Sequence, residues 1–353
     1  QIMKGYISYL KAMSSDVKIT YEGAIVKPLK HFKVFRSVMS AKQTESYDKA
    51  YRSDVKDKNP DIVNVQEETG STSGIYSNSR QASLFVFPDG TFGKEGFDKY
   101  FTKIEKGSIF HYNPNTDFKV AFIGSTPEEK LEKIRKHSST YASIIETVLS
   151  NPEKLHFIYD SFVHGSGSVV LGALFRAMGF GVANGNETAK APRYAILTNS
   201  TASQQTVNNI IKKFNSPENM HGDYIKVIIG SKILAEGITL KNVQSIHVAT
   251  PHWNYSEIAQ AIARGYRLGS HKALIERGIE PSFDIFQRVS ITPNTTSIDL
   301  TMYRISEIKD INIKQIERVI KESAVDCPLN YQRNLNRNPN AVGTRECDYM
   351  NCD

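Results

Sequence analysis

The chain has 353 residues, of which 40% are apolar and 23% are charged, a composition typical of a soluble globular protein with room for about two ordinary domains. It excludes a disordered polyelectrolyte, and it excludes a membrane protein because no stretch approaches the roughly 18 apolar residues of a spanning helix. Three cysteines exclude a disulfide scaffold and indicate a reducing, intracellular setting. Because the chain begins at Gln1, without a start methionine or a signal peptide, we expect it to be part of a longer protein.

Residues 1–150 combine short apolar stretches with many lysines and a polar insertion. A helix is predicted to begin after Ser40, whose hydroxyl can accept a hydrogen bond from the first turn. Residues 54–80 are rich in Ser, Asn, Asp and Glu and show no periodicity, which is typical of a surface loop. Apolar runs and spacing predict further elements: strands at 25–29 and 32–38, a turn at the end of 85–90, and a helix over 126–149.

Residues 151–290 alternate short apolar runs with helical segments. Such alternation predicts an α/β fold in which a parallel sheet is covered by helices on both faces. In sheets of this kind, the loops that leave the C-terminal ends of the strands carry the chemistry. The predicted strands are 156–162, 194–198, 226–229 and 245–249, and the predicted helices are 168–178, 203–214 and one that begins near 256.

Residues 291–353 are predicted to form a helix and an irregular tail rich in Asn and Arg. The helix covers 297–323, and its apolar stripe is interpreted as a docking face. That stripe consists of Ile305, Ile308, Ile311, Ile316 and Val319. Cys327, Cys347 and Cys352 could begin a zinc site, but no fourth ligand is evident in the sequence, so free cysteines are the favoured interpretation.

The most informative motif is Q-A-I-A-R-G-Y-R at 260–267. On a helix, Gln260, Arg264 and Arg267 are spaced i, i+4 and i+7, so all three would project from one face. Two guanidinium groups on one face stay charged and bind phosphate oxygens in a forked geometry, which suits a site where charge develops on a phosphoryl group. The alternative interpretation is an ordinary solvated helix face.

A glycine turn precedes this motif. The segment G-S-K-I-L-A-E-G-I-T-L at 230–240 follows the predicted strand 226–229, and its central glycine lets the backbone approach a ligand closely. The next predicted strand leads into an aromatic turn at 251–254 and then into the helix with Gln260 and its arginines. This ordered series is more specific than any of its parts.

With these motifs in order, residues 154–271 resemble the second RecA-like lobe of superfamily 2 helicases. Residues 230–240 correspond to motif V, residues 260–267 to motif VI in the Q-x-x-x-R-x-x-R form of Snf2-type translocases, and residues 156–162 with Gly165-Ser166-Gly167 to motif IV. Softer matches extend the resemblance to helicases of large DNA viruses, of the type of the poxvirus early transcription factor small subunit and nucleoside triphosphatase I. These matches lie at 5–9, 39–43 with Tyr47, 214–219, 251–254 and 270–271.

The resemblance implies an ATP-dependent helicase or translocase in which ATP lies between two lobes. Arg267 would act as the arginine finger, Arg264 would also reach the γ-phosphate, and Gln260 would help to place it. Glu236 and Gly237 would contribute to the ATP site and couple it to the bound strand. The nucleic-acid backbone would be contacted by Ser161, Gly165, Ser166, Gly167, Thr198, Ser200, Ser231 and Lys232.

The resemblance also implies three segments: an inter-lobe linker with strands and an insertion at 1–150, the helicase C-terminal RecA-like domain at 151–290, and a helical extension with its tail at 291–353. The sequence contains no G-x-x-x-x-G-K-[ST] and no D-E-x-x at a strand end, so ATP and Mg²⁺ would be held mainly by a first lobe. We therefore expect this chain alone to lack ATPase activity. The alternative is a non-catalytic RecA-like scaffold subunit that binds nucleic acid in a viral transcription complex.

For partners and location, the viral resemblance implies DNA rather than RNA as the bound strand, other viral transcription subunits, no membrane, and an intracellular site such as a virion or a cytoplasmic viral factory. The net charge of +7 is unevenly distributed. Residues 1–60 hold 12 basic and 6 acidic residues, and residues 154–253 hold 9 and 5. Because the second segment includes the nucleic-acid contacts that the resemblance implies, we expect salt to weaken binding steeply.

Overall fold

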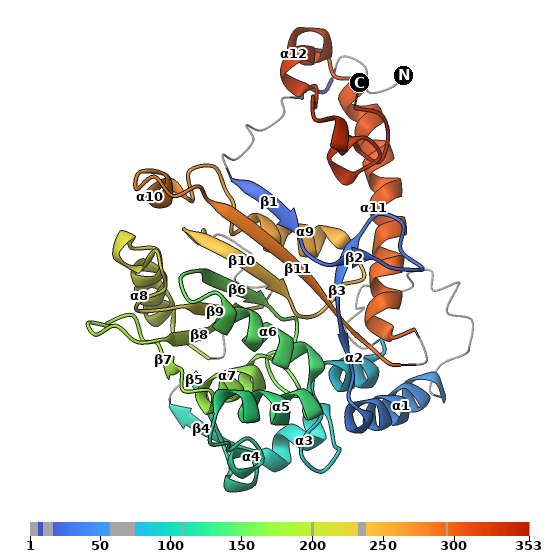
Figure 1. Cartoon of the computed structure of the whole chain (residues 1–353). Helices are drawn as coiled ribbons and strands as arrows, with labels where there is room; N and C mark the ends of the chain where they lie inside the picture. Colours follow the sequence, from blue (N-terminus) through green and yellow to red (C-terminus); the bar gives the residue numbers. More distant parts are fainter. Residues whose placement is uncertain are drawn as a thin grey trace.

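A single large sheet forms the centre of the computed structural model, which describes residues 6–9, 17–56, 75–106, 109–198, 201–231, 238–293 and 296–352. Within these residues the sheet has nine strands (Figure 1). Eight of them lie in the order β2-β3-β11-β10-β6-β9-β8-β7, and the ninth, β1, pairs with β11. The pairs are parallel except for β2 with β3. The strands are β1 (Lys18–Tyr21), β2 (Ala24–Ile25), β3 (Lys33–Val38), β6 (Leu155–Tyr159), β7 (Gly181–Val182), β8 (Arg193–Leu197), β9 (Val227–Gly230), β10 (Val243–Val248) and β11 (Ser282–Ile291).

Side chains along the central strands alternate between two hydrophobic cores. In β6, Phe157 belongs to one core and its neighbour Ile158 to the other. The first core also contains residues of α8 (Gln204–Phe214), α9 (Tyr255–Ala263) and α11 (Ile298–Glu322), and the second contains residues of α6 (Ser139–Ser150) and α7 (Ser168–Ala177). This arrangement confirms the expected RecA-like α/β fold, a parallel sheet with helices on both faces.

Serine caps set the helix boundaries around the sheet. Ser40 Oγ accepts a hydrogen bond from Gln43 N at the start of α1 (Ala41–Lys56), as the sequence predicts. The segment 126–149 forms two helices rather than one, α5 (Pro127–His137) and α6, because Ser138 is extended and its hydroxyl accepts from the first turn of α6.

The expectation that residues 54–80 form a loop is wrong at both ends. Residues 54–56 belong to α1, and Ser77–Leu84 form α2, while residues 57–74 lie outside the described part of the chain. The following elements form an aromatic-rich layer beside α7, whose side chains join the second core. They are α3 (Gly93–Tyr100), β4 (Phe101–Lys106), β5 (Ile109–Pro114) and α4 (Thr116–Ala121).

Strand β11 does not appear among the predicted strands because its polar residues are buried. Gln287, Arg288 and Ser290 are each at most 1% exposed, which breaks the apolar run that sequence patterns detect. The Arg288 guanidinium donates to Ser143 Oγ of α6 and to His247 Nδ1 of β10, at 2.6 and 3.0 Å. The partners that allow this burial come from other elements, so the local sequence gives no signal for them.

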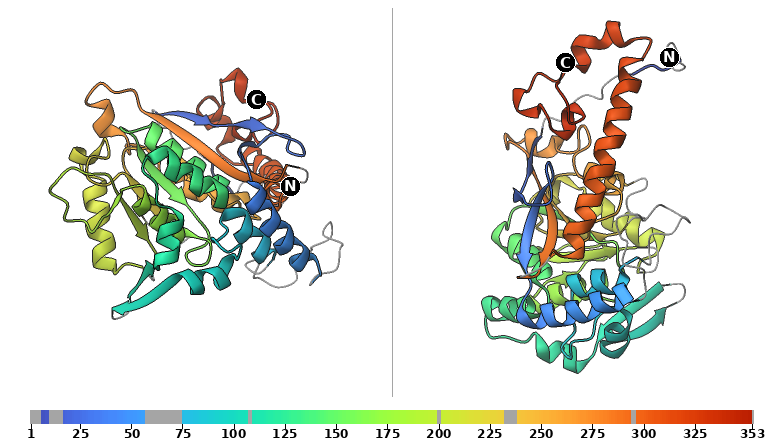
Figure 2. Two further views of the ribbon diagram at one scale, coloured as in Figure 1. Left: turned by 60° about the horizontal axis from the view of Figure 1, so that its bottom comes forward. Right: turned by 90° about the vertical axis from the view of Figure 1, so that its right-hand side faces the viewer.

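The long helix α11 leads from the sheet to the last elements of the chain (Figure 2). Its first turns are buried, whereas Ile316 and Val319, two members of the predicted stripe, are each 62% exposed. Beyond it, α12 (Cys327–Asn334) replaces part of the predicted irregular tail, and Val325 N donates to Ile7 O, so residues 6–9 lie beside this region. Strands β1, β2 and β3, from residues 1–150, belong to the same sheet as the strands of residues 151–290. The division of the chain into three segments stays a prediction.

The parallel strands give the sheet two edges with different residues. Tyr159 of β6 is in register with Gly230 and with Val248, and Leu197 of β8 is in register with Gly230, so these strands end together. We call the edge where β6, β8, β9 and β10 end the strand-end edge, and the opposite edge, where they begin, the strand-start edge. In open α/β sheets the strand-end edge is the usual place for a ligand.

Candidate functional site

The motif VI arginines lie at the strand-start edge. Helix α9 follows β10, runs back along the sheet and ends at Ala263, so Gln260 is on its last turn and Arg264 directly follows it. Arg267 lies three residues farther on, outside the helix, so the predicted single helical face is wrong for this residue. Only glycine fits at position 265, because a Cβ there would lie 2.6 Å from the Phe283 ring at the start of β11.

A hydrogen bond connects the ends of the two motifs. Arg267 Nη1 donates to Thr239 Oγ1 at 2.8 Å, and Leu240 N donates to Arg264 O at 3.2 Å. The Arg267 and Gln260 side chains are exposed and that of Arg264 is half-buried. The last residues of the motif V segment, 238–240, therefore lie beside the arginine turn.

Asn215 holds the same turn from a third element, and sequence reasoning assigned it no role. It caps the end of α8, where its side-chain amide donates to Thr239 O at 2.9 Å and its oxygen accepts from Lys241 N at 2.7 Å. The only sequence signal is its place in the segment 214–219, which matched viral helicases without a stated function. Four of the expected site residues, Ser200, Lys232, Glu236 and Gly237, lie outside the described residues.

Short hydroxyl side chains lie at the strand-end edge. Thr250, which follows β10, accepts from Ser161 N and donates to Ser161 Oγ after β6, both at 2.8 Å. After β8, Thr198 N donates to Thr201 Oγ1 at 3.2 Å, and Ser231 follows β9 in a buried position. The structure thus brings Ser161, Thr198 and Ser231 to one edge, away from the arginines.

The G-S-G loop of motif IV packs inward. Ser166 is fully buried; its hydroxyl donates to Phe85 O at 2.8 Å, and its backbone N–H donates to Gln81 Oε1 at 2.9 Å. Gly165 has φ +67°, and a Cβ there would lie 2.1 Å from Gln81 Oε1. A Cβ at Gly167 would lie 2.1 Å from Phe162 O. The glycines allow this loop to pack closely against the protein. Its contact with a nucleic-acid strand stays a prediction.

Comparison with known proteins identifies the fold family. Residues 187–269, which include both motif V and motif VI, match the family model of the helicase conserved C-terminal domain. The chain is 38% identical over 99% of its length to "Putative helicase 087L" of Invertebrate iridescent virus 3, covering 34% of that protein. The chain therefore contains the C-terminal RecA-like lobe of a superfamily 2 helicase.

Two further relatives share parts of this helicase lobe. It is 32% identical over 70% of its length to a "Putative ATP-dependent RNA helicase" of Heliothis virescens ascovirus 3e, covering 26% of that protein. It is 35% identical over 27% of its length to "Termination factor NPH-I homolog" of African swine fever virus, covering 14% of that protein. The lobe therefore spans about a third or less of each of these three relatives.

Buried ionisable side chains lie beneath the strand-end edge of the helicase lobe. Asp160 is fully buried, accepts from Phe162 N at 2.9 Å and from Tyr141 OH at 3.0 Å, and burial raises its pKa to about 7. Burial likewise raises the pKa of Asp299 to about 6. Arg80 of α2 is 6% exposed, and its guanidinium lies 4.9 Å from the centre of the Phe162 ring. The positive charge of Arg80 partly offsets the effect of burial on both carboxyl groups.

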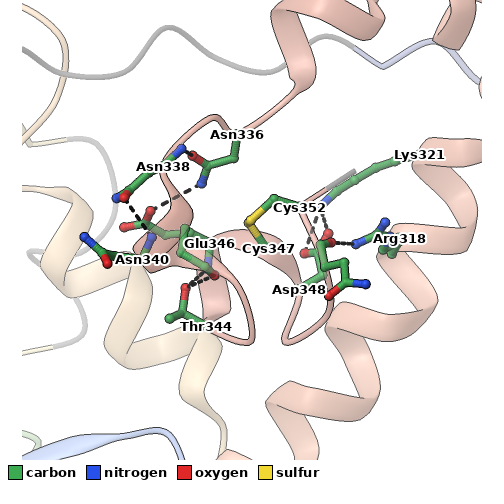
Figure 3. The surroundings of a disulfide bond; sticks show 12 residues. Arg318, Lys321, Asn336, Asn338, Asn340, Thr344, Glu346, Cys347, Asp348 and Cys352 are labelled. Carbon is green, nitrogen blue, oxygen red and sulfur yellow. Dashed lines mark hydrogen bonds and ion pairs between the residues drawn. A yellow bond between two sulfur atoms is a disulfide. The ribbon is translucent and has the colours of Figure 1, made fainter.

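The expectation of free cysteines is wrong for two of the three cysteines in the chain. Cys347 and Cys352 form a disulfide with their Cα atoms 5.0 Å apart (Figure 3). Cys327 is a free, half-buried thiol. Lys321 of α11 donates to both carboxylate oxygens of Asp348 inside this loop. Among the described residues, no three His, Cys, Asp or Glu side chains are placed to hold a metal ion. No helix in the described part of the chain is long and apolar enough to span a bilayer.

Proposed function

We propose that this lobe is the second motor lobe of an ATP-dependent helicase or translocase that acts on nucleic acid. The observation that carries the proposal is the Arg267–Thr239 hydrogen bond, which joins the ends of motifs V and VI into one surface. An exposed arginine held by one neighbour is suited to reach a phosphate that another part of the protein presents.

In this proposal Arg267 is the arginine finger, and Arg264 and Gln260 lie beside it on the nucleotide side. The Thr239 hydroxyl occupies one guanidinium nitrogen of Arg267 and fixes the direction of the side chain. Such a finger accelerates phosphoryl transfer by about 10³- to 10⁵-fold by stabilising charge on the transferring phosphoryl group. Glu236 and Gly237 would link this site to the bound strand.

Arg267, Arg264 and Gln260 could contact ATP only from the side of its γ-phosphate. ATP supplies the phosphoryl group whose transfer drives movement. The cationic side chains of this lobe can bind its oxygens, and the described residues contain no cluster of three His, Cys, Asp or Glu side chains that could hold a metal ion. We therefore assign the metal and the nucleotide cradle to the remainder of a longer protein, since the lobe spans only 34% of its iridescent virus relative.

At the strand-end edge, we propose that Ser161, Thr198 and Ser231 contact the sugar–phosphate backbone. Hydroxyl groups and backbone N–H groups commonly bind phosphate oxygens without reading the sequence. The viral resemblance favours DNA, whereas the ascovirus relative is named as an RNA helicase. The assay below therefore uses both.

The test is ATP hydrolysis by the full-length protein, alone and with single- and double-stranded DNA and RNA. We expect nucleic acid to stimulate hydrolysis, and Arg267→Ala to abolish the stimulated activity. Arg277→Ala, which removes an exposed arginine from the same region, is the matched control and should leave it intact. Activity of Arg267→Ala within about three-fold of wild type would contradict the arginine-finger assignment.

A second candidate is a RecA-like scaffold subunit of a viral transcription complex. It is favoured by the absence of G-x-x-x-x-G-K-[ST] from this sequence and by the similarity to a viral termination factor homolog. The same assay separates the two, because a scaffold would bind nucleic acid without ATP hydrolysis by the full-length protein. A nucleic-acid-stimulated ATPase would contradict the scaffold.

A further inference from the structure

A groove beside the strand-end edge takes no part in the sites described above. It is lined by the β4–β5 hairpin, α7, the β7–β8 pair and the start of α8, and we call it the hairpin groove. Its empty volume is about 1010 Å³, part of which is open to solvent. Thr201 lines the groove, and its hydroxyl forms a hydrogen bond with the Thr198 hydroxyl at 2.8 Å. The groove therefore adjoins the edge of the sheet where the nucleic-acid strand is proposed to bind.

The walls of the hairpin groove are mostly apolar. Val169, Ala173 and Arg176 line it from one face of α7, as their spacing of four and three residues requires. Tyr194 of β8 lies beneath them, where Gly172 leaves room for its ring because a Cβ there would lie 2.8 Å from Tyr194 Cε2. Tyr112 of the hairpin lines the opposite side. A planar group fits between such walls.

The Tyr194 hydroxyl is a polar group available to a ligand in the groove. Tyr194 is 4% exposed and lines the groove, and its hydroxyl makes no hydrogen bond in the described part of the chain. The hydroxyl is protonated at neutral pH, and burial raises the pKa of Tyr194 further above its usual value. A hydroxyl that opens into a groove can donate to an acceptor on a ligand there.

The charge of the groove restricts that ligand further. None of the described residues that line the groove is acidic, and Arg176 is exposed with neither an ion pair nor a side-chain hydrogen bond in the described part of the chain. The ligand should therefore combine planar apolar faces, a hydrogen-bond acceptor and a nearby negative charge. A nucleobase attached to a phosphate chain has all three properties.

We infer that the hairpin groove binds an unpaired base of the nucleic-acid strand, an inference that rests on the proposed function. Tyr194 OH donates to an acceptor on the base, the walls of α7 and Tyr112 contact its faces, and Arg176 neutralises the adjoining phosphate. Contacts between bases and aromatic side chains are worth about 1–3 kcal/mol per base and tolerate any sequence. The strand is thereby held by a base as well as by its backbone.

The experiment measures the affinity of the full-length protein, without nucleotide, for a labelled oligothymidylate of about 12 nucleotides and for an abasic strand of the same length. We expect the abasic strand to bind about ten-fold more weakly. Tyr194→Phe should weaken binding of the base-bearing strand about three-fold and leave the abasic strand unchanged, because only the hydroxyl is removed. Tyr331→Phe, at an exposed tyrosine on α12, is the matched control.

A second pair of variants tests the charge. Arg176→Gln should weaken binding of both strands about five-fold, whereas Arg36→Gln, at an exposed arginine on β3, should change neither. Equal affinity for base-bearing and abasic strands would overturn the inference that the groove binds a base, and so would equal effects of Tyr194→Phe and Tyr331→Phe. Neither result would contradict the proposed function. Failure to bind any strand would overturn the proposed function itself.

Discussion

The two edges of the sheet carry different kinds of side chain. At the strand-start edge, exposed Arg267 is held by one side-chain hydrogen bond to Thr239. At the strand-end edge, short hydroxyls such as those of Ser161 and Thr250 are bonded to each other above buried Asp160. Long cationic side chains can reach a phosphate held by another part of the protein, whereas short interlocked groups form a fixed surface for a backbone. The comparison teaches that one lobe can serve two ligands because parallel strands keep its two edges apart.

The largest effect is expected at the strand-start edge. Arg267→Ala in the full-length protein should lower kcat for ATP hydrolysis by about 10³-fold or more. Arg267→Lys should recover less than about ten-fold of this loss, because a lysine lacks the forked donors that bind Thr239 and a phosphate together. Near-complete recovery by lysine would show that charge alone suffices and that the geometry at this edge is unimportant.

The next effect concerns the buried layer of the strand-end edge. The pKa of Asp160 is about 7 in the folded chain against an ordinary 3.8, so its contribution to stability is present below about pH 4 and is lost as pH rises through about 7. Asp160→Asn does not titrate, so its free energy of unfolding relative to wild type should rise by about 2–4 kcal/mol between about pH 4 and pH 8. Arg80 and Tyr141 moderate this change by favouring the charged form.

Urea denaturation of the 353-residue chain at several pH values measures this difference. Asp117→Asn, at an exposed aspartate in α4, is the control and should show no such trend. A pH-independent difference for Asp160→Asn would mean that Asp160 is not held in the neutral form by burial.

A smaller effect is expected in the C-terminal tail, which contacts the start of α9, the helix that leads to the strand-start edge. Arg345 donates to both carboxylate oxygens of buried Asp310 at 2.8 and 3.1 Å, and its guanidinium lies 4.9 Å from the Tyr255 ring at the start of α9. Arg345→Gln leaves that carboxylate without its cation, so the free energy of unfolding should fall by about 2 kcal/mol. Arg337→Gln, at an exposed arginine in the same tail, should change it little.

The smallest effect belongs to the strand-end surface. Ser161→Ala should weaken binding of single-stranded nucleic acid by the full-length protein about three-fold, because one hydroxyl contact to the backbone is lost. Fluorescence anisotropy measures this change, with Ser125→Ala at an exposed serine before α5 as the control. If both substitutions had the same effect, this edge would not be the nucleic-acid surface.

Much of the central fold follows from local patterns in the sequence. The alternation of apolar runs and helices predicts β6, β8, β9 and β10 in order, because each is buried on both faces. The same reasoning does not find β11, where Arg288 is buried through partners on α6 and β10. Local patterns predict elements whose burial is apolar, and they fail where distant side chains make polar burial possible.

In the candidate site, too, some features follow from local sequence patterns and others depend on the folded structure. The order of the glycine and arginine turns leads to the family resemblance, and the contact between Arg267 and Thr239 is seen only in the structure. The end of α9 at Ala263, before Arg267, is not indicated by the helical spacing of the motif. The burial of Arg80 near Asp160 depends on segments brought together by folding. The pairing of Cys347 with Cys352 is local, because the two residues are only five apart.

The most direct test of separate edges is the affinity of Arg267→Ala for single-stranded nucleic acid, measured with the full-length protein at fixed salt and without nucleotide. The account predicts a Kd within about two-fold of wild type, although the same preparation hydrolyses ATP about 10³-fold more slowly. A loss of strand affinity comparable with the loss of hydrolysis would contradict it, because Arg267 would then belong to both surfaces.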